Sequence, residues 1–216
     1  METSNYSTEA QISLKKAIMI IVISVVAVAA IGLAVGYKFF WNQFDTATKA
    51  DRKMAIIEDV VKKNPTSPVA HVQLGLQYMA RGENKKALEE LEKGYKLDNK
   101  NLAARLYLGI AYKDDKQLDK ALKLLSGVVE ENHANLLGIV NLGTVYFEKK
   151  DYKNALKQFD SALIVNPGAA DILVLRGKTY AAMGKKDKAL ADVDKALKFV
   201  PDYQEALDAK KEISGK

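Results

Sequence analysis

Cysteine is absent from this chain of 216 residues, and proline (four residues) and histidine (two residues) are scarce. Without cysteine the protein forms no disulfide, has no thiolate nucleophile and offers no cysteine-ligated metal site. The two histidines, His71 and His133, lie far apart in the sequence and do not show the spacing of metal ligands. A phosphate-binding loop and a nucleophile motif are missing as well. The sequence therefore predicts a protein that is not an enzyme and that holds no cofactor and no metal ion.

The excess of positive charge is small. The chain has 33 basic and 27 acidic side chains, a net charge of +6, and the two signs are mixed along the sequence. Mixed charges of this kind are typical of solvated helix faces. Proteins that bind nucleic acids instead carry a compact basic stripe, often with interleaved aromatic residues. We therefore predict no nucleic-acid partner.

One long hydrophobic run lies near the N-terminus. Residues 1–16 form a polar tail, and residues 17–36 (AIMIIVISVVAVAAIGLAVG) contain no charged side chain. A helix of this length spans roughly 30 Å, which is the thickness of the hydrocarbon layer of a membrane. Lys15 and Lys16 precede the run, and the aromatic-rich residues 37–41 follow it, as is typical of a membrane interface. We predict a single transmembrane helix at residues 17–36.

The same run allows a second interpretation. Residues 34–36 (AVG) have the small side chains of a signal-peptidase site, so the run also fits a cleaved signal peptide. We favour a retained anchor, because the run is longer than the apolar core of a usual signal peptide.

The flanking basic residues determine the predicted orientation of this helix. Lys15 and Lys16 against Lys38 place the short tail in the cytoplasm and the rest of the chain outside it, which is the orientation that we favour. A wider window that includes residues 49–53 (KADRK) reverses the count and places the rest of the chain in the cytoplasm.

A pattern of 34 residues occurs four times between residues 68 and 203. Each copy holds a glycine, a tyrosine three residues later and an alanine nine residues after the tyrosine, and no insertion breaks the register. A strict period of this length is typical of stacked helical hairpins rather than of one globular core. The recurring residues are Gly75, Gly109, Gly143 and Gly177, Tyr78, Tyr112, Tyr146 and Tyr180, and Ala87, Ala121, Ala155 and Ala189.

Each copy divides into two helices joined by a short turn. In the first copy we predict helices at residues 68–80 and 85–97, with Ser67 as the N-cap and Pro68 in the first turn. The glycine permits close approach of the second helix, and the alanine opposite it must also be small. The predicted repeats are residues 68–101, 102–135, 136–169 and 170–203.

Further helical segments flank the repeats. Residues 37–67 are predicted to be a juxtamembrane linker and an N-terminal capping helix, which ends before Asn64-Pro65 because the residue before a proline disfavours helix. Pro65 is in register with the prolines of the third and fourth copies, so this helix resembles the second half of an incomplete repeat. Residues 204–216 are predicted to be a C-terminal capping helix. Its side chains predicted to face the fourth repeat are Ala206, Leu207 and Ile213.

The pattern resembles the tetratricopeptide repeat family, whose consensus reads W-x2-L-G-x2-Y, then A-x3-F, then P. Three copies hold Leu-Gly-x-x-Tyr, at residues 74–78, 108–112 and 142–146, and the fourth has Arg176 in place of the leucine. The resemblance implies a right-handed superhelix whose concave groove is lined by the first helices of the repeats. It also implies that the groove binds peptides or helices of other proteins and carries out no catalysis. The tryptophan positions hold His71, Arg105, Ile139 and Leu173.

Opposite the Leu-Gly-Tyr face, the helical periodicity places mostly apolar side chains, where a solvated helix face carries charges. A large exposed apolar surface usually marks a binding site. We therefore predict a groove for an apolar peptide or helix of a partner protein. The alternatives are packing between adjacent helices and occupation by the protein's own termini. The predicted groove residues are Leu76, Met79, Tyr107, Ile110, Lys113, Asn141, Thr144, Phe147 and Lys178.

The predicted fold is thus an all-α solenoid of helical hairpins with one N-terminal transmembrane helix. The predicted function is that of a membrane-anchored scaffold or adaptor for protein partners in the assembly of an envelope complex. The alternative is an import or chaperone receptor on an organelle surface, with the repeats in the cytosol. The carboxylate clamp of some family members is not predicted, because only Asn141 among the corresponding positions has the required chemistry.

Overall fold

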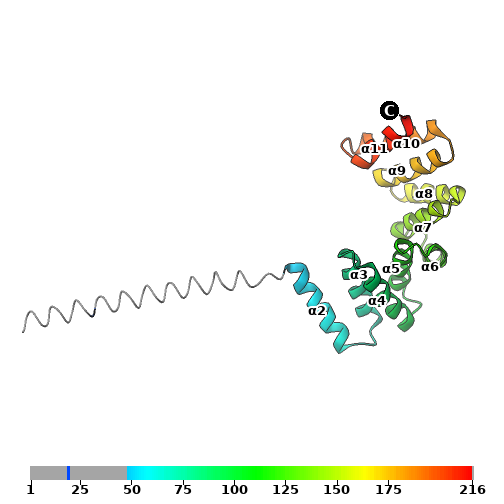
Figure 1. Ribbon diagram of the computed structural model, residues 1–216. Coiled ribbons are helices and arrows are strands. Elements are labelled where there is room, and N and C mark those ends of the chain that lie inside the picture. Colours follow the sequence, from blue (N-terminus) through cyan, green and yellow to red (C-terminus); the bar gives the residue numbers. More distant parts are fainter. Residues whose placement is uncertain (1–18, 20–47, 216) are drawn as a thin grey trace, which may run out of the picture. The chain divides into compact units, whose positions relative to one another are not determined.

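The computed structural model describes Met19 and residues 48–215, and the chain divides into two units, residues 1–52 and 53–216. The predicted transmembrane helix at residues 17–36 lies outside the described residues except for Met19. Within the described part, no helix combines the length and the apolar character that crossing a membrane requires. All the repeats lie in the second unit, where they stack on one another (Figure 1).

Every regular element of the described residues is an α-helix. Repeat one consists of α3 (Pro68–Ala80) and α4 (Asn84–Leu97), and repeat two of α5 (Leu102–Asp114) and α6 (Leu118–Glu131). Repeat three consists of α7 (Leu136–Glu148) and α8 (Tyr152–Val165), and repeat four of α9 (Ala170–Ala182) and α10 (Lys186–Phe199). Before them lies α2 (Lys49–Lys63), and after them α11 (Gln204–Ser214). The predicted all-α solenoid of helical hairpins is confirmed.

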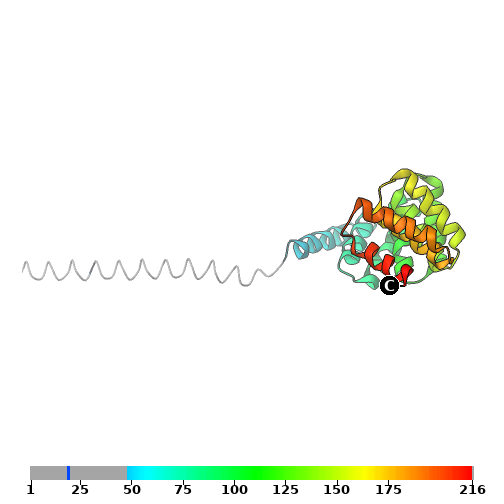
Figure 2. The same ribbon diagram turned by 90° about the horizontal axis from the view of Figure 1, so that it is seen from above.

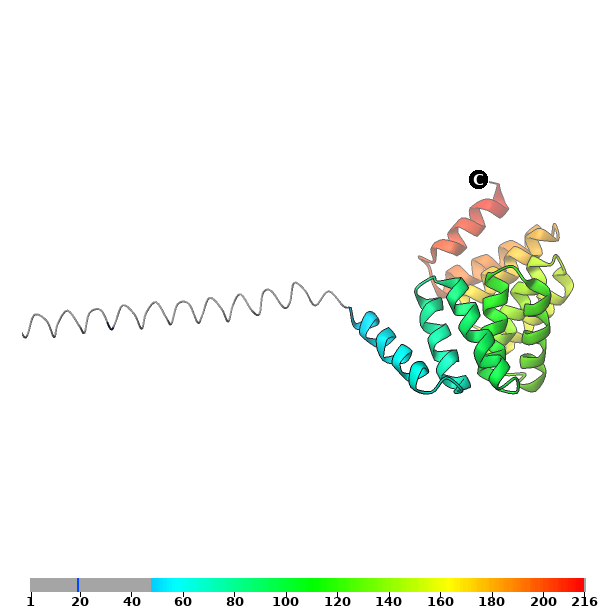
Figure 3. The same ribbon diagram turned by 60° about the horizontal axis from the view of Figure 1, so that its bottom comes forward.

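The hairpins stack in sequence order, and their contacts are asymmetric. The first helices α3, α5, α7 and α9 each contact the next first helix, and α9 contacts α11. The second helices contact their own partner and the first helix of the next hairpin, and within residues 53–215 no second helix contacts another. Because the first helices lie closer together than the second helices, the stack curves with the first helices on its concave side (Figures 2 and 3).

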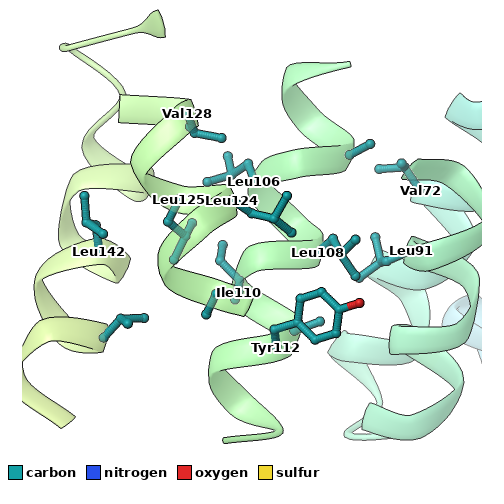
Figure 4. Close-up of a cluster of buried hydrophobic side chains, with 14 residues drawn as sticks. Val72, Leu91, Leu106, Leu108, Ile110, Tyr112, Leu124, Leu125, Val128 and Leu142 are labelled. Atoms are coloured by element: carbon teal, nitrogen blue, oxygen red, sulfur yellow. The ribbon is translucent and has the colours of Figure 1, made fainter. Parts of the chain in front are cut away.

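The glycine of each repeat allows the two helices of a hairpin to touch. A Cβ atom added to Gly75 would lie 2.6 Å from Cγ of Leu91, and one added to Gly143 would lie 2.7 Å from the Phe159 ring. Both distances are shorter than any normal contact, so any side chain there would push α3 from α4 and α7 from α8. The recurring alanine of the second helix has no exposed surface in any repeat. Figure 4 shows Leu91 and the equivalent Leu125 inside one continuous apolar cluster.

The turn inside each hairpin has one backbone geometry in all four copies. Its left-handed residue is Gly82, Lys116, Lys150 or Gly184, with φ between 62° and 75°. The next residue donates its N–H to the carbonyl of the repeat tyrosine, for example over 2.9 Å from Glu83 to Tyr78. This is the Schellman pattern, which satisfies carbonyl groups at the end of a helix. The turn therefore explains why the register survives without insertions.

Two of the recurring tyrosines also form a hydrogen bond to the helix before their own repeat. The Tyr112 hydroxyl donates to Oε1 of Glu92 on α4 over 2.7 Å, and the Tyr78 hydroxyl donates to Oε1 of Glu58 on α2 over 3.3 Å. Burial and the carboxylate raise the pKa of both phenols. Glu58 and Glu92 are one period apart in the sequence. The interpretation of α2 as the second half of an incomplete repeat stays a prediction.

The terminal helices differ in how well they are packed. On α2, Ile56 is 65% exposed and Val60 is 39% exposed, and only Met54 is buried. On α11, Ala206 and Ala209 are buried against repeat four and Ile213 is half-buried. The prediction that Leu207 faces repeat four was wrong, since Leu207 is 40% exposed. The buried stripe of α11 follows a three-residue step from Ala206 to Ala209, because small side chains are needed where α11 lies closest to α10.

Candidate functional site on the concave face

The nine predicted groove residues, here called the concave row, all lie on first helices. None of them is exposed: Ile110 and Asn141 are buried, and the other seven are half-buried. Leu76, Met79 and Tyr107 pack against the apolar cluster that contains Ile110, which Figure 4 shows among the buried side chains. Much of the concave row is therefore used in packing between adjacent first helices. What remains accessible is one side of each half-buried side chain.

Two members of the concave row bind each other. Nζ of Lys113 on α5 donates to Oδ1 of Asn141 on α7 over 2.7 Å, and the Asn141 amide donates to the Leu137 carbonyl over 2.8 Å. Thr144 donates its hydroxyl to the Val140 carbonyl one turn earlier. These polar groups already have partners inside the protein. They stabilise the contact between α5 and α7.

A pocket of about 740 Å³ opens at the C-terminal end of the concave face. Three inner helices contribute to it, namely α7, α9 and α11. Phe147 and Lys178 of the concave row are part of its lining, so the structure brings these two predicted residues to one site. The full lining is Phe147, Lys178, Ala181, Ala182, Gly184, Lys186, Ala209, Glu212 and Ile213.

Small residues of repeat four line the pocket at positions where repeats two and three have larger ones. Ala181 and Ala182 end α9, whereas the equivalent residues of repeat three are Phe147 and Glu148. In repeat two the same two positions hold Lys113-Asp114. From α11, Ala209 adds a third methyl group to the lining. The space that side chains fill in the preceding repeats is therefore open in repeat four.

Lysines from repeat four hold α11 at both ends of the pocket. Nζ of Lys178 lies 2.6 Å from Oε1 of Glu205, and the Tyr203 hydroxyl donates to Oε2 of the same carboxylate over 2.9 Å. These two hydrogen bonds hold the pKa of Glu205 below its usual 4.5. Burial and the bond to Glu205 raise the pKa of Tyr203 to about 12. At the other end, Nζ of Lys186 donates to the Ser214 carbonyl over 3.3 Å.

Repeat four also contains an ion network behind its concave face. Arg176 donates from Nε and Nη2 to the two carboxylate oxygens of Asp192 over 2.7 and 2.6 Å, and from Nη1 to Asp160 over 2.7 Å. Asp192 is buried, and the hydrogen bonds to Asp192 and Asp160 raise the pKa of the guanidinium further. This network fixes α9 against α10 and α8. It supports the pocket wall without lining the pocket.

The histidines have structural surroundings. His71 is buried, with Nδ1 2.7 Å from Oε2 of Glu90 and Nε2 2.9 Å from the Pro65 carbonyl. His133 is exposed in the turn between α6 and α7. Among residues 48–215 no group of three or more potential ligands is close enough to bind a metal ion. His71 therefore joins α3, α4 and the end of α2.

The predicted groove residues include two of the pocket lining, Phe147 and Lys178, and leave out the rest. The missed residues include the small ones, Ala181, Ala182 and Ala209, and those on α11, Glu212 and Ile213. One signal was present in the sequence, because Ala181-Ala182 is the only one of the four equivalent pairs with two methyl side chains. The position of α11 depends on tertiary packing, and no period in the sequence indicates it.

Comparison with known proteins agrees with the hairpin stack. Residues 78–137 and 140–208 match two family models, each described as tetratricopeptide repeat. No curated protein matches the chain. Among solved structures, "YrrB: a TPR protein with an unusual peptide-binding site" is 28% identical, with a TM-score of 0.66, and the match covers 82% of this chain and 92% of that one.

Two further solved structures share the fold at lower identity. MamA is 23% identical with a TM-score of 0.62, and the match covers 81% of this chain and 94% of that chain. A chain of the "APC/C hetero-tetramer Cut9-Hcn1" is 19% identical with a TM-score of 0.70, and the match covers 76% of this chain and 33% of that chain. At these identities the likeness extends to the arrangement of the helices alone.

Proposed function

We propose that this chain is a membrane-anchored scaffold that binds a polypeptide segment of a partner on its concave face. The chain belongs to the tetratricopeptide repeat family, which is generally a non-catalytic protein-interaction fold. The observation that carries this proposal is the accessible apolar surface of the concave face, which ends in an open pocket beside Phe147. The peptide-binding site named for YrrB supports the same class of ligand.

The proposed ligand runs along the concave row and contacts the accessible sides of its half-buried residues. Tyr107 on α5 and Phe147 on α7 are the aromatic members of the row, and aromatic anchors in desolvated positions dominate binding at many interfaces. Charged groups contribute less, because Lys113 and Lys178 already bind Asn141 and Glu205. The ligand is therefore held mainly by apolar contact.

The proposed anchor is the apolar run at residues 17–36, and its support is the sequence alone. An anchored scaffold fits a role in assembling an envelope complex with the repeats outside the cytoplasm. Protease treatment of intact cells tests this orientation. Digestion of the repeats in intact cells agrees with it, whereas protection until the cytoplasmic membrane is opened favours a receptor with cytosolic repeats.

Crosslinking in intact cells followed by mass spectrometry tests the binding function. We expect crosslinked partner peptides to map to α5, α7, α9 and α11. Tyr107→Ala and Phe147→Ala should each lower partner capture by about tenfold, since an aromatic anchor contributes roughly 2 kcal/mol. The matched control is Lys157→Glu on α8, an exposed residue of a second helix. Loss of capture with Lys157→Glu alone would place the partner on the convex side and contradict the proposal.

A further inference from the structure

We infer that the pocket between α7, α9 and α11 anchors one apolar side chain of a polypeptide that carries an acidic residue beside it. This inference rests on the proposed function and names the chemistry of the partner and the place where it is held. Three observations support it: the apolar lining of the pocket, the two lysines in that lining, and the weak acceptor that one of these lysines now has.

The lining of the pocket suits an apolar side chain. Phe147 and Ile213 are its large apolar residues, and Ala181, Ala182 and Ala209 are its small ones. The volume of about 740 Å³ is within the range of pockets that hold small ligands. It is large enough for a phenylalanine or leucine side chain together with its backbone. A shorter or polar side chain would leave the apolar lining in contact with water.

The lining of the pocket holds two basic residues and one acidic residue. Lys178 of α9 and Lys186 of α10 belong to repeat four, and Glu212 belongs to α11. With two lysines against one glutamate, the pocket favours an acidic residue of the ligand over a basic one. Ligands with basic residues at this place meet two ammonium groups. The net charge of +6 on the chain adds a long-range attraction for acidic partners.

Lys186 is the lysine that is available for a ligand. Its ammonium group is exposed and donates to a neutral carbonyl, that of Ser214, over 3.3 Å. Lys178 instead makes a 2.6 Å contact with the Glu205 carboxylate. Exchange of a backbone carbonyl for a carboxylate gives Lys186 a charge-assisted hydrogen bond, which is shorter and stronger than a neutral one. Lys178 keeps its present partner and continues to hold α11.

NMR titration of the isotope-labelled full-length protein in non-ionic detergent tests the inference with three capped nonapeptides of glycine and serine. Their central residues are Asp-Phe-Asp, Lys-Phe-Lys or Asp-Ser-Asp. The first should cause saturable shifts at Ala181, Ala182 and Ile213. The second should bind about tenfold or more weakly, and the third should cause no saturable shift. Equal affinity of the first two peptides would overturn the role of the rim charges.

Matched variants separate the pocket from its surroundings. Ala181→Phe fills the pocket with the residue of repeat three and should abolish the shifts, whereas Ala191→Phe at an exposed position of α10 should not. Lys186→Ser should remove the preference for the acidic peptide, whereas Lys195→Ser on the same helix should retain it. Thermal melts of all four variants show whether the fold is kept, and unaltered binding to a folded Ala181→Phe variant would overturn the inference.

Other outcomes identify other occupants and each contradicts the inference. Saturable shifts confined to α5 and α7 would leave the proposed concave-face binding intact and exclude the pocket. Shifts at Ala181 and Ile213 that depend on protein concentration without peptide would mean that a second copy fills the pocket. No shift with any peptide would also reject the pocket as an anchor, while partner crosslinks across the concave row would still support the proposed function.

Discussion

Repeat two and repeat four have the same backbone geometry and differ in the side chains that pack between their helices. In both, the recurring alanine is fully buried and the left-handed turn residue has a φ of 62° or 75°. Beside the glycine, repeat two has the buried leucines 108 and 124, whereas repeat four has Arg176 and Asp192. The hairpin therefore depends on a few small residues and on the turn. At the other positions between its helices it accepts either apolar side chains or an ion pair.

The same two repeats differ on the concave face. Repeat two ends its inner helix with Lys113-Asp114 and binds Asn141 of the next repeat through Lys113. Repeat four ends its inner helix with Ala181-Ala182, and the vacated space is part of the pocket. Repeat two, with its larger side chains, thus contributes contacts within the solenoid. Repeat four, with two alanines at these positions, contributes the surface that we propose for binding.

The largest expected effect comes from the position that both repeats share. Ala121→Arg and Ala189→Arg place a long cationic side chain where no surface is exposed. Overpacking and a buried unpaired charge should each reduce stability, by about 3–5 kcal/mol in total. Ala121→Arg should be the more damaging, since repeat two has a complete hairpin on both sides, whereas repeat four has only α11 on one side, and each repeat is stabilised by its neighbours. Urea denaturation followed by circular dichroism measures both, and an unchanged midpoint for either variant would contradict the helix pairing.

The next largest effect comes from the ion pair between Arg176 and Asp192 in repeat four. Arg176→Leu leaves Asp192 buried without its partner and should cost about 2–4 kcal/mol, reduced from the value of a fully buried pair because Arg176 is partly solvated. The double variant Arg176→Leu/Asp192→Leu gives repeat four the two leucines of repeat two. Its free energy of unfolding should be within about 1 kcal/mol of that of the wild-type protein. Denaturant midpoints of Arg176→Leu and of the double variant decide this. A double variant as unstable as Arg176→Leu would mean that repeat four requires the ion pair.

A smaller effect is expected at the turn. Gly184→Lys gives repeat four the residue of repeat two, Lys116, at a left-handed backbone position and should cost about 1 kcal/mol. The reverse substitution in repeat three, Lys150→Gly, should stabilise by up to about 1 kcal/mol for the same reason. Both differences are measurable by thermal denaturation. A stabilising Gly184→Lys together with a destabilising Lys150→Gly would show that the turn residues contribute through side-chain contacts.

The smallest effect concerns the link between repeat four and α11. Repeat two has Ile110 where repeat four has Lys178, so only the latter forms an ion pair with Glu205. Because the pKa of Glu205 is lowered in the folded protein, this stabilisation is complete above pH 4.5 and is lost as the pH falls below it. The exchange rate of α11 relative to the intrinsic amide rate at the same pH should then rise by roughly twofold to fivefold, as expected for an exposed pair. Glu205→Gln should remove this pH dependence, and a wild-type protection factor that is flat between pH 6 and pH 3.5 would argue against the link.

The fold could be predicted from the sequence because it is a local property repeated four times. The spacing of Gly75, Tyr78 and Ala87 defines one hairpin, and the same chemistry recurs with the same register. The end of α2 at Lys63 was also predictable, because Pro65 disfavours helix before it. Arg176 was visible as a departure from the pattern. Its partner Asp192 was not, because the pairing crosses a turn between two helices.

The candidate site was predictable only in part. The periodicity placed Phe147 and Lys178 on the concave side, where both line the pocket. It gave no information on Ala209 and Ile213, because their contribution depends on how α11 lies against repeat four. The error at Leu207 has the same origin, since helical periodicity alone does not say which side of a terminal helix meets its neighbour.

The central claim is that the ligand binds where small side chains leave a pocket on the concave face. A reciprocal exchange of residues between repeats two and four tests it. Ala181→Lys/Ala182→Asp gives repeat four the filling of repeat two, and Lys113→Ala/Asp114→Ala empties repeat two. Titration of each variant with the Asp-Phe-Asp peptide should show lost binding in the first and retained binding in the second. Retained binding in the first variant together with lost binding in the second would contradict the claim and place the ligand on repeat two.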